Sequence, residues 1–313
     1  MSRQRGWTAE HIPDLSERVF VVTGANSGLG LATTRALSRR GAHVILAVRD
    51  ETKGRETAAR LTAEIPGARL DVRRIDLADL DSVRAFSDAL HAEHTRLDVL
   101  VNNAGLMAPP RRTPSAQGHE VQFAVNHLGH FALTGLLLDL LEGGEDPRVV
   151  TVTSANHRLG RLFFDDLGGE RRRYSPMGCY NRSKLANAAF GHQLQQRLTA
   201  AGSPVRSLLA HPGYTATNLQ TSAPAGAVAF LFGRLLQPLA QSPDHGALPT
   251  LYAATAPDVR GGQFIGPDGL GELRGAPTTV RLAPRAADAE SGRRLWELSE
   301  ELTSVRFAIP AAG

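Results

Sequence analysis

Short apolar runs alternate with longer helical patterns through the first two thirds of the chain, and this alternation constrains the fold more than any other feature. The apolar runs are rich in β-branched residues and end in glycine, proline or polar residues, which is typical of buried parallel strands. They cover residues 18–24, 42–48, 97–105, 147–154 and 205–213, and a further strand is expected within 68–77, ending at Asp76.

Segments with helical periodicity separate these runs, near residues 29–40, 52–65, 79–95, 116–141 and 178–200. They are long enough to carry the chain from one parallel strand back to the start of the next. The sequence therefore predicts an α/β fold with a Rossmann-type doubly wound parallel sheet, which binds ligands at the carboxyl ends of its strands. We expect a single domain over residues 1–313, with its core at about 15–300, because no repeat or clean boundary interrupts the pattern.

Charge and cysteine content narrow the setting of the protein. The sequence pI is near 9.7, but the formal net charge is only +4 and the arginines form short scattered clusters, so we expect solvated faces and no nucleic-acid groove. The single cysteine, Cys179, cannot form an internal disulfide, and no run of about 18 uncharged apolar residues occurs. We expect a cytoplasmic protein without membrane contact, and homo-oligomer formation is left open.

An apolar segment interrupted by proline and glycine covers residues 218–243, after the last of these strands. It holds too many aliphatic and aromatic residues for an exposed loop. We expect it to form a C-terminal lid over an apolar, fairly bulky substrate, and contact with a membrane surface is the alternative.

The first strand ends in TGANSGLG, with glycines at positions 24, 28 and 30 directly before a helical pattern. Glycine permits a tight turn from strand to helix and lets backbone amides approach a pyrophosphate at the helix N-terminus. The spacing T-G-x-x-x-G-x-G differs from the G-x-G-x-x-G of most dinucleotide-binding dehydrogenases. The loop predicts a dinucleotide site, and glycines that only shape the turn are the alternative.

Lysine is nearly absent from the chain. Lys53 and Lys184 are the only two lysines, so 33 of the 35 Lys and Arg residues are arginine. Lys184 follows Tyr180 by four residues, which places both side chains on one face of a helix. Because arginine would serve equally well for solvation, we infer that this site requires a compact ammonium group, and a chance surface pair is the alternative.

Five motifs follow one another along the chain: TGxxxGxG at 23–30, NNAG at 102–105, VTS ending at Ser154, Y-x-x-x-K at 180–184 and HPG at 211–213. Together they resemble the short-chain dehydrogenase/reductase family, and the resemblance covers about residues 15–300. Within that family, FAVNHLGHFALT and the tail pattern GPDGLGELRG with LWELSEELT resemble the branch that includes retinol dehydrogenases and many actinobacterial oxidoreductases.

The resemblance implies a catalytic tetrad of Asn126, Ser154, Tyr180 and Lys184. Tyr180 would exchange a proton with the substrate oxygen, and Ser154 would orient that oxygen by a hydrogen bond. Lys184 would lower the pKa of the Tyr180 phenol from its usual value of about 10 and would bond the nicotinamide ribose. Asn126 would hold a water that links Lys184 to solvent, and an exposed, merely tolerated asparagine is the alternative.

The interval from Ser154 to Tyr180 is longer than in compact members of the family. It spans 26 residues and includes Phe163 and Phe164. These two aromatic side chains either line the mouth of the substrate site or anchor the loop to the body of the protein.

The resemblance also implies dinucleotide contacts at successive strand ends. Asp76 would meet the adenine, the backbone at Pro212 and Gly213 would approach the nicotinamide, and a threonine after them would bond its carboxamide or the pyrophosphate. The expected set is Gly24, Asn26, Ser27, Gly28, Leu29, Gly30, Arg49, Asp76, Leu77, Asn103, Ala104, Gly105, Tyr180, Lys184, Pro212, Gly213, Thr215 and Thr217. The histidines at 127, 130, 157 and 211 show no metal-ligand spacing, so they are expected to be structural and no metal is expected.

The end of the second strand predicts the choice of cofactor. An NAD-preferring enzyme of this kind usually places an acidic side chain there to bond the ribose 2′-hydroxyl. This chain has Val48 followed by Arg49, whose guanidinium can bind the 2′-phosphate of NADP. We expect NADP(H) in preference to NAD(H), unless Arg49 points to solvent and pairs with Asp50 or Glu51.

These features together predict an NADP(H)-dependent oxidoreductase that interconverts a carbonyl and an alcohol on a small molecule by hydride transfer, with a tyrosine as general acid/base. One alternative is a non-catalytic sensor or scaffold that binds NADP(H), although such proteins typically lack the tyrosine or the lysine. A second alternative is an epimerase or dehydratase of the extended branch, which resembles a different glycine spacing.

Overall fold

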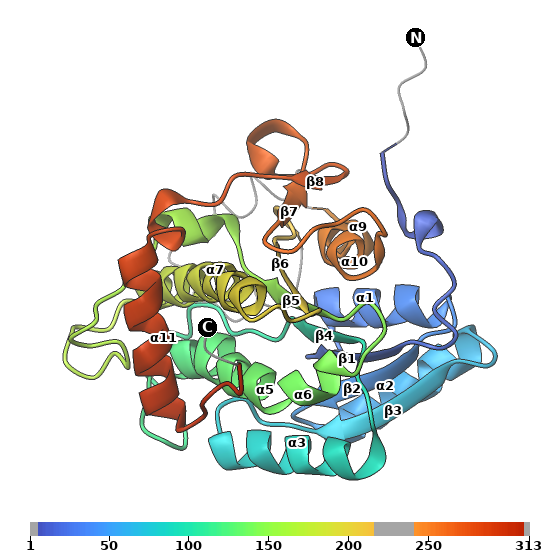
Figure 1. Ribbon diagram of the computed structural model, residues 1–313, viewed down its shortest axis with the longest axis horizontal. Coiled ribbons are helices and arrows are strands. Elements are labelled where there is room, and N and C mark those ends of the chain that lie inside the picture. The colour runs from blue at the N-terminus through green and yellow to red at the C-terminus, as the bar shows by residue number, and fades with distance from the viewer. Residues whose placement is uncertain (1–5, 216–240, 310–313) are drawn as a thin grey trace.

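The computed structural model describes residues 6–215 and 241–309 of the chain. In this part of the protein, eight strands form one sheet (Figure 1) in the order β3-β2-β1-β4-β5-β6-β7-β8. Neighbouring strands from β3 to β7 are parallel, and β8 runs antiparallel to β7 at the edge. The predicted doubly wound sheet is confirmed.

Six strands coincide with the apolar runs of the sequence to within a few residues. They are β1 (Val19–Thr23), β2 (His43–Val48), β3 (Arg69–Arg74), β4 (Val99–Asn102), β5 (Arg148–Val152) and β6 (Arg206–Ala210). The sequence pattern did not identify β7 (Phe264–Pro267) or β8 (Pro277–Thr279).

Helices cover both faces of the sheet (Figure 1). They are α1 (Gly28–Ser38), α2 (Glu51–Glu64), α3 (Leu80–Glu93), α4 (Val121–Phe123), α5 (Gly129–Leu136), α6 (Leu138–Glu142), α7 (Pro176–Ala200), α9 (Pro243–Gly246), α10 (Leu248–Thr255) and α11 (Ala289–Thr303). Shorter helical turns are η1 (Ala9–His11), η3 (Ala155–Leu159), η6 (Leu270–Glu272), η7 (Pro284–Ala286) and the π-helical turn η2 (Ala124–Leu128) between α4 and α5.

The core lies on both faces of the sheet because successive strand residues point in opposite directions. Val21 of β1 belongs to the cluster formed with α3, α5, α7 and α11, whereas Phe20 and Val22 belong to the cluster formed with α1 and α10. Strands buried on both faces read as continuous apolar runs, which explains why the sequence shows them so clearly.

The helix expected over 116–141 begins later than its pattern suggests. Gly118 has φ +88° and turns the chain, and the buried Glu120 carboxylate then accepts the amides of Gln122 and Phe123. This N-cap starts α4 at Val121 and leaves residues 116–120 outside the helix. The predicted start was therefore wrong by five residues.

The helix α11 closes one face through aromatic packing. Its Trp296 ring lies 5.2 Å from Phe131, 5.9 Å from Phe190 and 4.5 Å from Phe307, measured between centroids. The expected lid, 218–243, lies outside the described residues except for 241–243, so it stays a prediction. Within 6–215 and 241–309, no helix combines the length and apolar character that crossing a membrane requires.

Candidate active site

The loop after β1 lies at the carboxyl edge of the sheet and requires its glycines. Gly24 and Gly28 have positive φ values of 67° and 51°. A Cβ on Gly30 would lie 2.3 Å from the Gly24 carbonyl oxygen and 2.7 Å from Asn103 Nδ2. Larger side chains at these positions would block the turn, so the strand, loop and helix form as the motif predicts.

The helix α1 begins without a side-chain cap. Its N-cap is Ser27, whose hydroxyl accepts no amide of the first turn, and that turn holds no acidic residue. The long helices α2, α3, α7 and α11 are each capped by their N-cap side chains, which belong to Asp50, Asp79, Ser175 and Asp288. The first amides of α1, near Asn26 and Leu29, thus remain available to an anion, and a dinucleotide pyrophosphate fits this glycine cradle.

The chain after β4 is fastened to the end of β1. Thr23 Oγ1 accepts the amides of Asn103 and Ala104, both at 2.9 Å, and Asn103 Nδ2 donates to the Thr23 carbonyl at 2.8 Å. Two neighbouring strand ends are thereby held together, so the predicted Asn103–Gly105 segment borders the glycine loop.

Arg49 and Asp76 follow β2 and β3 at the same edge. Val48 is buried at the end of β2, whereas Arg49 is exposed. Asp76 Oδ1 accepts the Ala78 amide at 3.0 Å, which shapes the turn that contains Leu77. The predicted adenine-side residues therefore lie at the ends of adjacent strands.

The acidic neighbours of Arg49 have other partners. Asp50 Oδ1 accepts the Lys53 amide at 3.1 Å, and Asp50 Oδ2 lies 3.5 Å from Lys53 Nζ. Glu51 lies 3.8 Å from Arg55. Among the ion pairs of the described residues, none joins Arg49 to Asp50 or Glu51, so the alternative in which they hold its guanidinium is not observed.

The chain after β6 carries the third part of the expected dinucleotide site. Gly213 has φ +66°, and a Cβ there would lie 2.4 Å from the Leu273 carbonyl oxygen. Thr215 Oγ1 donates to the Pro212 carbonyl at 3.0 Å. Thr217 lies outside the described residues.

Tyr180 and Lys184 lie one turn apart on the buried side of α7. Lys184 Nζ donates to the Val152 carbonyl of β5 at 3.1 Å and lies 5.9 Å from the centroid of the Tyr180 ring. Ser154 caps η3, two residues after the end of β5, and its side chain lies beside Tyr180. The fold thus brings together three residues that are distant from one another in sequence.

Burial sets the protonation of this group. Desolvation raises the pKa of Tyr180 above its usual 10, although the hydrogen bond with Ser154 opposes the change. Desolvation also lowers the pKa of Lys184 from 10.5 to about 8. Burial and Ser154 are the causes that set this direction, so the expected lowering of the Tyr180 pKa by Lys184 stays a prediction.

Asn126 lies fully buried in the π-helical turn η2, which excludes an exposed, tolerated asparagine. Its Nδ2 donates to the Leu106 carbonyl and to Ser183 Oγ, both at 2.9 Å, and its Oδ1 accepts the Leu106 amide at 2.7 Å. A Cβ on Gly105 would lie 3.3 Å from Asn126 Oδ1 and 3.6 Å from Lys184 Nζ. Asn126 thus joins the NNAG segment to α7 beside Lys184.

The four histidines singled out in the sequence have structural partners. The nearest contacts are His127 with Ser299 Oγ at 3.0 Å, His130 with Thr23 Oγ1 at 2.9 Å, His157 with the Ser154 carbonyl at 2.7 Å and His211 with Glu272 Oε2 at 2.9 Å. Burial lowers the pKa of His127 to about 3 and that of His130 to about 4.

Phe164 anchors the long loop between Ser154 and Tyr180. It packs against the cluster that contains Leu167 and Leu295 and lies under the Arg294 guanidinium, 4.3 Å from it. Phe163 lies under Arg172 at 4.2 Å. Phe164 therefore anchors the loop to the body of the protein, which is one of the two roles expected for these aromatic residues.

Two contacts with the site were missed by sequence reasoning. Leu106 bonds Asn126 through its backbone, and Glu272 bonds His211 from the loop between β7 and β8. No local pattern predicts either pairing, although Glu272 is one of the two carboxylates, with Asp268, in the tail motif GPDGLGELRG.

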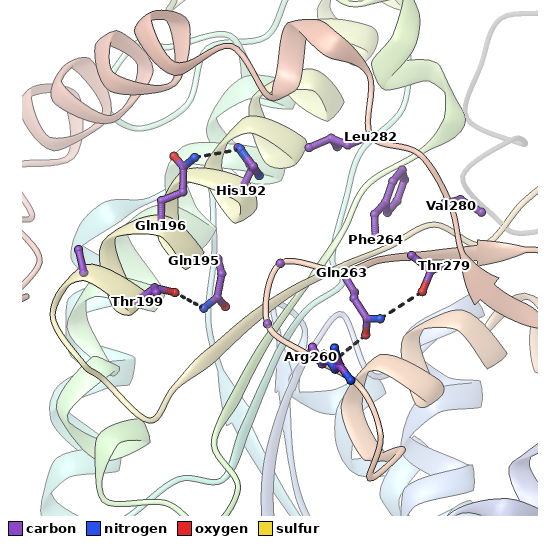
Figure 2. A pocket seen from close by; sticks show the side chains of 13 residues that line it. His192, Gln195, Gln196, Thr199, Arg260, Gln263, Phe264, Thr279, Val280 and Leu282 are labelled. Atoms are coloured by element: carbon purple, nitrogen blue, oxygen red, sulfur yellow. Dashed lines mark hydrogen bonds between the residues drawn. The ribbon is translucent and has the colours of Figure 1, made fainter.

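A separate groove of about 710 Å³ lies between the C-terminal half of α7 and the β7–β8 edge (Figure 2). Its lining includes His192, Gln195, Gln196, Arg260, Gln263 and Phe264. None of the predicted site residues lines it, so it is distinct from the candidate active site.

Comparison with known proteins gives concordant matches. The family model described as short chain dehydrogenase matches residues 18–227. Retinol dehydrogenase 14 of Mus musculus is 40% identical over 299 residues, which cover 92% of this chain and 86% of that protein. Polyprenol dehydrogenase of Mus musculus is 41% identical over 299 residues, with 93% and 85% covered.

Solved structures agree with these relatives. An uncharacterized protein from Mycobacterium paratuberculosis superposes with a TM-score of 0.81 at 46% identity, covering 96% of this chain and 99% of that one. An alcohol dehydrogenase from the archaeon Thermococcus sibiricus, complexed with 5-hydroxy-NADP, has a TM-score of 0.60 at 26% identity, with 78% and 93% covered. With its strand-end motifs assembled at one edge of a doubly wound sheet, the chain belongs to the short-chain dehydrogenase family, is retinol dehydrogenase-like, and is an oxidoreductase of alcohols and carbonyl compounds.

Proposed function

We propose that the protein is an NADP(H)-dependent enzyme that interconverts a carbonyl and an alcohol on an apolar, fairly bulky small molecule. The observation that carries the proposal is the meeting of the half-buried Ser154 with the buried Tyr180 and Lys184. Burying an ammonium and a phenol together is costly. A sensor or scaffold that only binds a dinucleotide has no need of this arrangement.

Tyr180 acts as the general acid in the reductive direction. Because its pKa lies above 10, the phenol carries its proton near neutrality and donates it to the carbonyl oxygen of the substrate. Ser154 donates a hydrogen bond to the same oxygen and orients it. The nicotinamide supplies or accepts the hydride when it is bound.

Lys184 and Asn126 connect this proton to solvent. The position above Gly105 lies within 3.6 Å of Lys184 Nζ and 3.3 Å of Asn126 Oδ1. A water near this position would bond both groups, which supports the proposed proton relay.

The glycine cradle and Arg49 support the proposed dinucleotide contacts. The uncapped amides of α1 and the backbone at Gly24 and Gly30 would hold the pyrophosphate, and Arg49 would hold the 2′-phosphate. Two facts support NADP(H): the acidic neighbours of Arg49 pair with Lys53 and Arg55, and the Thermococcus sibiricus relative was solved with 5-hydroxy-NADP.

Relatives and exposed apolar side chains support the proposed substrate class. Two relatives are named for alcohols with long apolar chains, retinol and polyprenol. Leu159 ends η3, the turn that Ser154 caps, and is 69% exposed, and Leu273, whose carbonyl lies beside Gly213, is 41% exposed. These side chains offer apolar surface to a bulky substrate. The single, buried Cys179 fits a reducing compartment, and we propose the cytoplasm.

The test is a panel of carbonyls and alcohols that includes retinal and isoprenoid aldehydes, followed by NADPH absorbance. Tyr180→Phe should keep its fold and dinucleotide affinity but lose about a hundredfold or more in turnover, because the positioned acid is gone. Tyr252→Phe is the matched control, since that hydroxyl bonds Asp258 and lies outside the site. Near-parental turnover in Tyr180→Phe, or substrate isomerisation without net dinucleotide oxidation, would contradict the proposal.

A further inference from the structure

Glu272 of η6 joins two segments of the candidate active site. Its Oε2 lies 2.9 Å from His211 Nε2, and Arg158 Nη2 donates to both carboxylate oxygens at 2.8 Å. Arg158 belongs to η3, the turn that Ser154 caps, and His211 directly precedes Pro212 and Gly213. One carboxylate therefore bridges the Ser154 turn and the Gly213 loop.

The hydrogen bonds of His211 fix its tautomer. The Gly213 amide donates to His211 Nδ1 at 3.3 Å, so the neutral ring carries its proton on Nε2 and donates it to Glu272. The ring is fully buried, and a Cβ on Gly266 would lie 2.2 Å from His211 Nε2. The ring packs against the backbone of Gly266 and bonds both Glu272 and the Gly213 amide. A displacement of Glu272 would therefore shift His211 and, with it, Gly213.

Leu273, which follows Glu272 in the loop between β7 and β8, also contacts Gly213. The Leu273 carbonyl accepts the Tyr214 amide at 2.8 Å and occupies the space where a Cβ on Gly213 would lie. Glu272 and Leu273 thus both contact the segment around Gly213. Residues 268–275 therefore support the geometry of this segment together with β6.

Charge keeps the bridge intact. Arg158 and His211 outweigh the effect of burial and lower the pKa of the Glu272 carboxyl, while burial lowers that of His211. His157, the other titratable group here, lies beside Arg158 and bonds the Ser154 carbonyl with Nδ1 and the Ala283 amide with Nε2. Near neutrality the bridge consists of a carboxylate, a guanidinium and two neutral imidazoles.

We propose that Glu272 is a positioning residue: it holds the Ser154 turn and the Gly213 loop in register, so that a substrate oxygen at Ser154 faces the nicotinamide that would lie against Gly213. The inference builds on the proposed function, because it concerns alignment for hydride transfer. If Glu272 has this role, its removal should lower turnover but leave the affinity for the adenosine half of the dinucleotide unchanged.

The kinetic test uses three variants. Glu272→Ala and Arg158→Met should each lower kcat per folded molecule on the order of tenfold, because small misalignments are costly to hydride transfer. The double variant should be no worse than Glu272→Ala, since Arg158 acts through Glu272. With NADPH deuterated at the transferred position, the isotope effect on kcat should rise. Arg158 is 36% exposed, so its variant folds even if Glu272→Ala proves unstable.

A binding test works without turnover. Glu272→Ala should weaken NADP⁺ binding about fivefold, the effect of one lost hydrogen bond, and should leave 2′,5′-ADP, which lacks the nicotinamide half, unchanged. If the parent prefers NAD⁺, the comparison is between NAD⁺ and AMP. Glu93→Gln is the matched control, because Glu93 pairs with Arg73 on the outer β3 strand, away from the site.

The outcomes separate the two proposals. An inactive parent overturns the proposed function, while the binding comparison still decides the role of Glu272. An active parent whose Glu272→Ala and Arg158→Met variants keep parental kcat and parental NADP⁺ affinity overturns the positioning role. A lowered Tm with unchanged kcat per folded molecule also overturns it, because that result describes a purely structural bridge.

Discussion

Lys184 lies in a space that suits a narrow side chain. Its Nζ reaches the Val152 carbonyl at 3.1 Å, and Asn187 Nδ2 donates to the same oxygen at 3.3 Å. The backbone of Gly105 approaches from the other side, with its would-be Cβ 3.6 Å from Nζ. In a chain that otherwise uses arginine almost throughout, this confined setting explains why a lysine is kept.

Lys184→Arg should be severely impaired although the charge is kept. A guanidinium is planar and wider than an ammonium, so it cannot take the same place between Gly105 and Val152 without displacing its neighbours. We expect turnover to fall about a hundredfold while dinucleotide affinity falls less. Lys53→Arg is the control, because Lys53 is 70% exposed. Parental turnover in Lys184→Arg would show that the site does not require a lysine.

Arg49 decides the expected cofactor preference. We expect catalytic efficiency with NADPH to exceed that with NADH by at least about tenfold, since charge-assisted hydrogen bonds contribute about 1.5–3 kcal/mol. Arg49→Ala should lose most of this margin through a raised Michaelis constant for NADPH. Arg55→Ala, which removes a neighbouring guanidinium from α2, should keep it. A parental ratio near one would refute the assignment.

At the scale of elements, α7 presents Tyr180 and Lys184 from its first turns. The helix starts where Ser175 accepts the Gly178 amide and Pro176 occupies the first turn, both common at helix N-termini. Its middle then packs between β5, β6 and α11, so most of its length is buried. The pair proposed to be catalytic thus lies on a helix that is well packed over most of its length.

Removing the ring of Trp296 should show how strongly α11 supports that element. Its ring contacts Phe131 and Phe190, so Trp296→Ala leaves a cavity and should lower the free energy of unfolding by about 3–5 kcal/mol. Denaturant unfolding measures this loss. Arg293→Ala, on the exposed side of α11, should change stability by no more than about 0.5 kcal/mol. A small effect of Trp296→Ala would mean that α11 is only loosely attached.

Elements with strong local signals were predictable from the sequence, and elements fixed by distant contacts were not. The β1 run has five apolar or β-branched residues between a charged residue and a glycine, and its limits were found to within a residue. The β7 strand has four residues, of which two are glycine and proline, and forms only by pairing with β6 and β8. The late start of α4 depends on a local cap, Glu120, which the longer apolar periodicity obscured.

The candidate site divides in the same way. The motifs indicated Ser154, Tyr180 and Lys184 because each lies at a fixed place in a strand or helix pattern. They could not indicate that the Asn126 side chain bonds Leu106 and Ser183, or that burial would raise the pKa of Tyr180, since both depend on how distant segments pack. Periodicity carries no information on such contacts.

Across the whole molecule, buried histidines link stability to pH. Burial lowers the pKa of His127 to about 3 and those of His130 and His211 to about 4, whereas the unfolded chain has ordinary values near 6.5. Below pH 6.5 the unfolded state therefore binds more protons, so stability should fall as the pH decreases toward 4. Each histidine contributes about 1.4 kcal/mol per pH unit, and His91, whose pKa is raised, acts in the opposite direction.

Urea unfolding at pH 7 and pH 5 measures this dependence. We expect a decrease of several kcal/mol, on the order of 1.4 kcal/mol per pH unit for each buried histidine. His245→Gln should leave the slope unchanged, since His245 is exposed. Equal stability at the two pH values would show that the buried imidazoles can take up protons in the folded state.

Both outer strands of the sheet carry features that discourage joining to another sheet. At one side β8 has three residues, begins with Pro277 and runs against the direction of its neighbours. At the other side β3 carries arginines at 69, 73 and 74, and adding a second copy in parallel would stack like charges. Edge strands that are short, charged or contain proline are less able to pair with a strand of another molecule. We therefore expect the folded protein not to aggregate through pairing of its edge strands, even at high concentration.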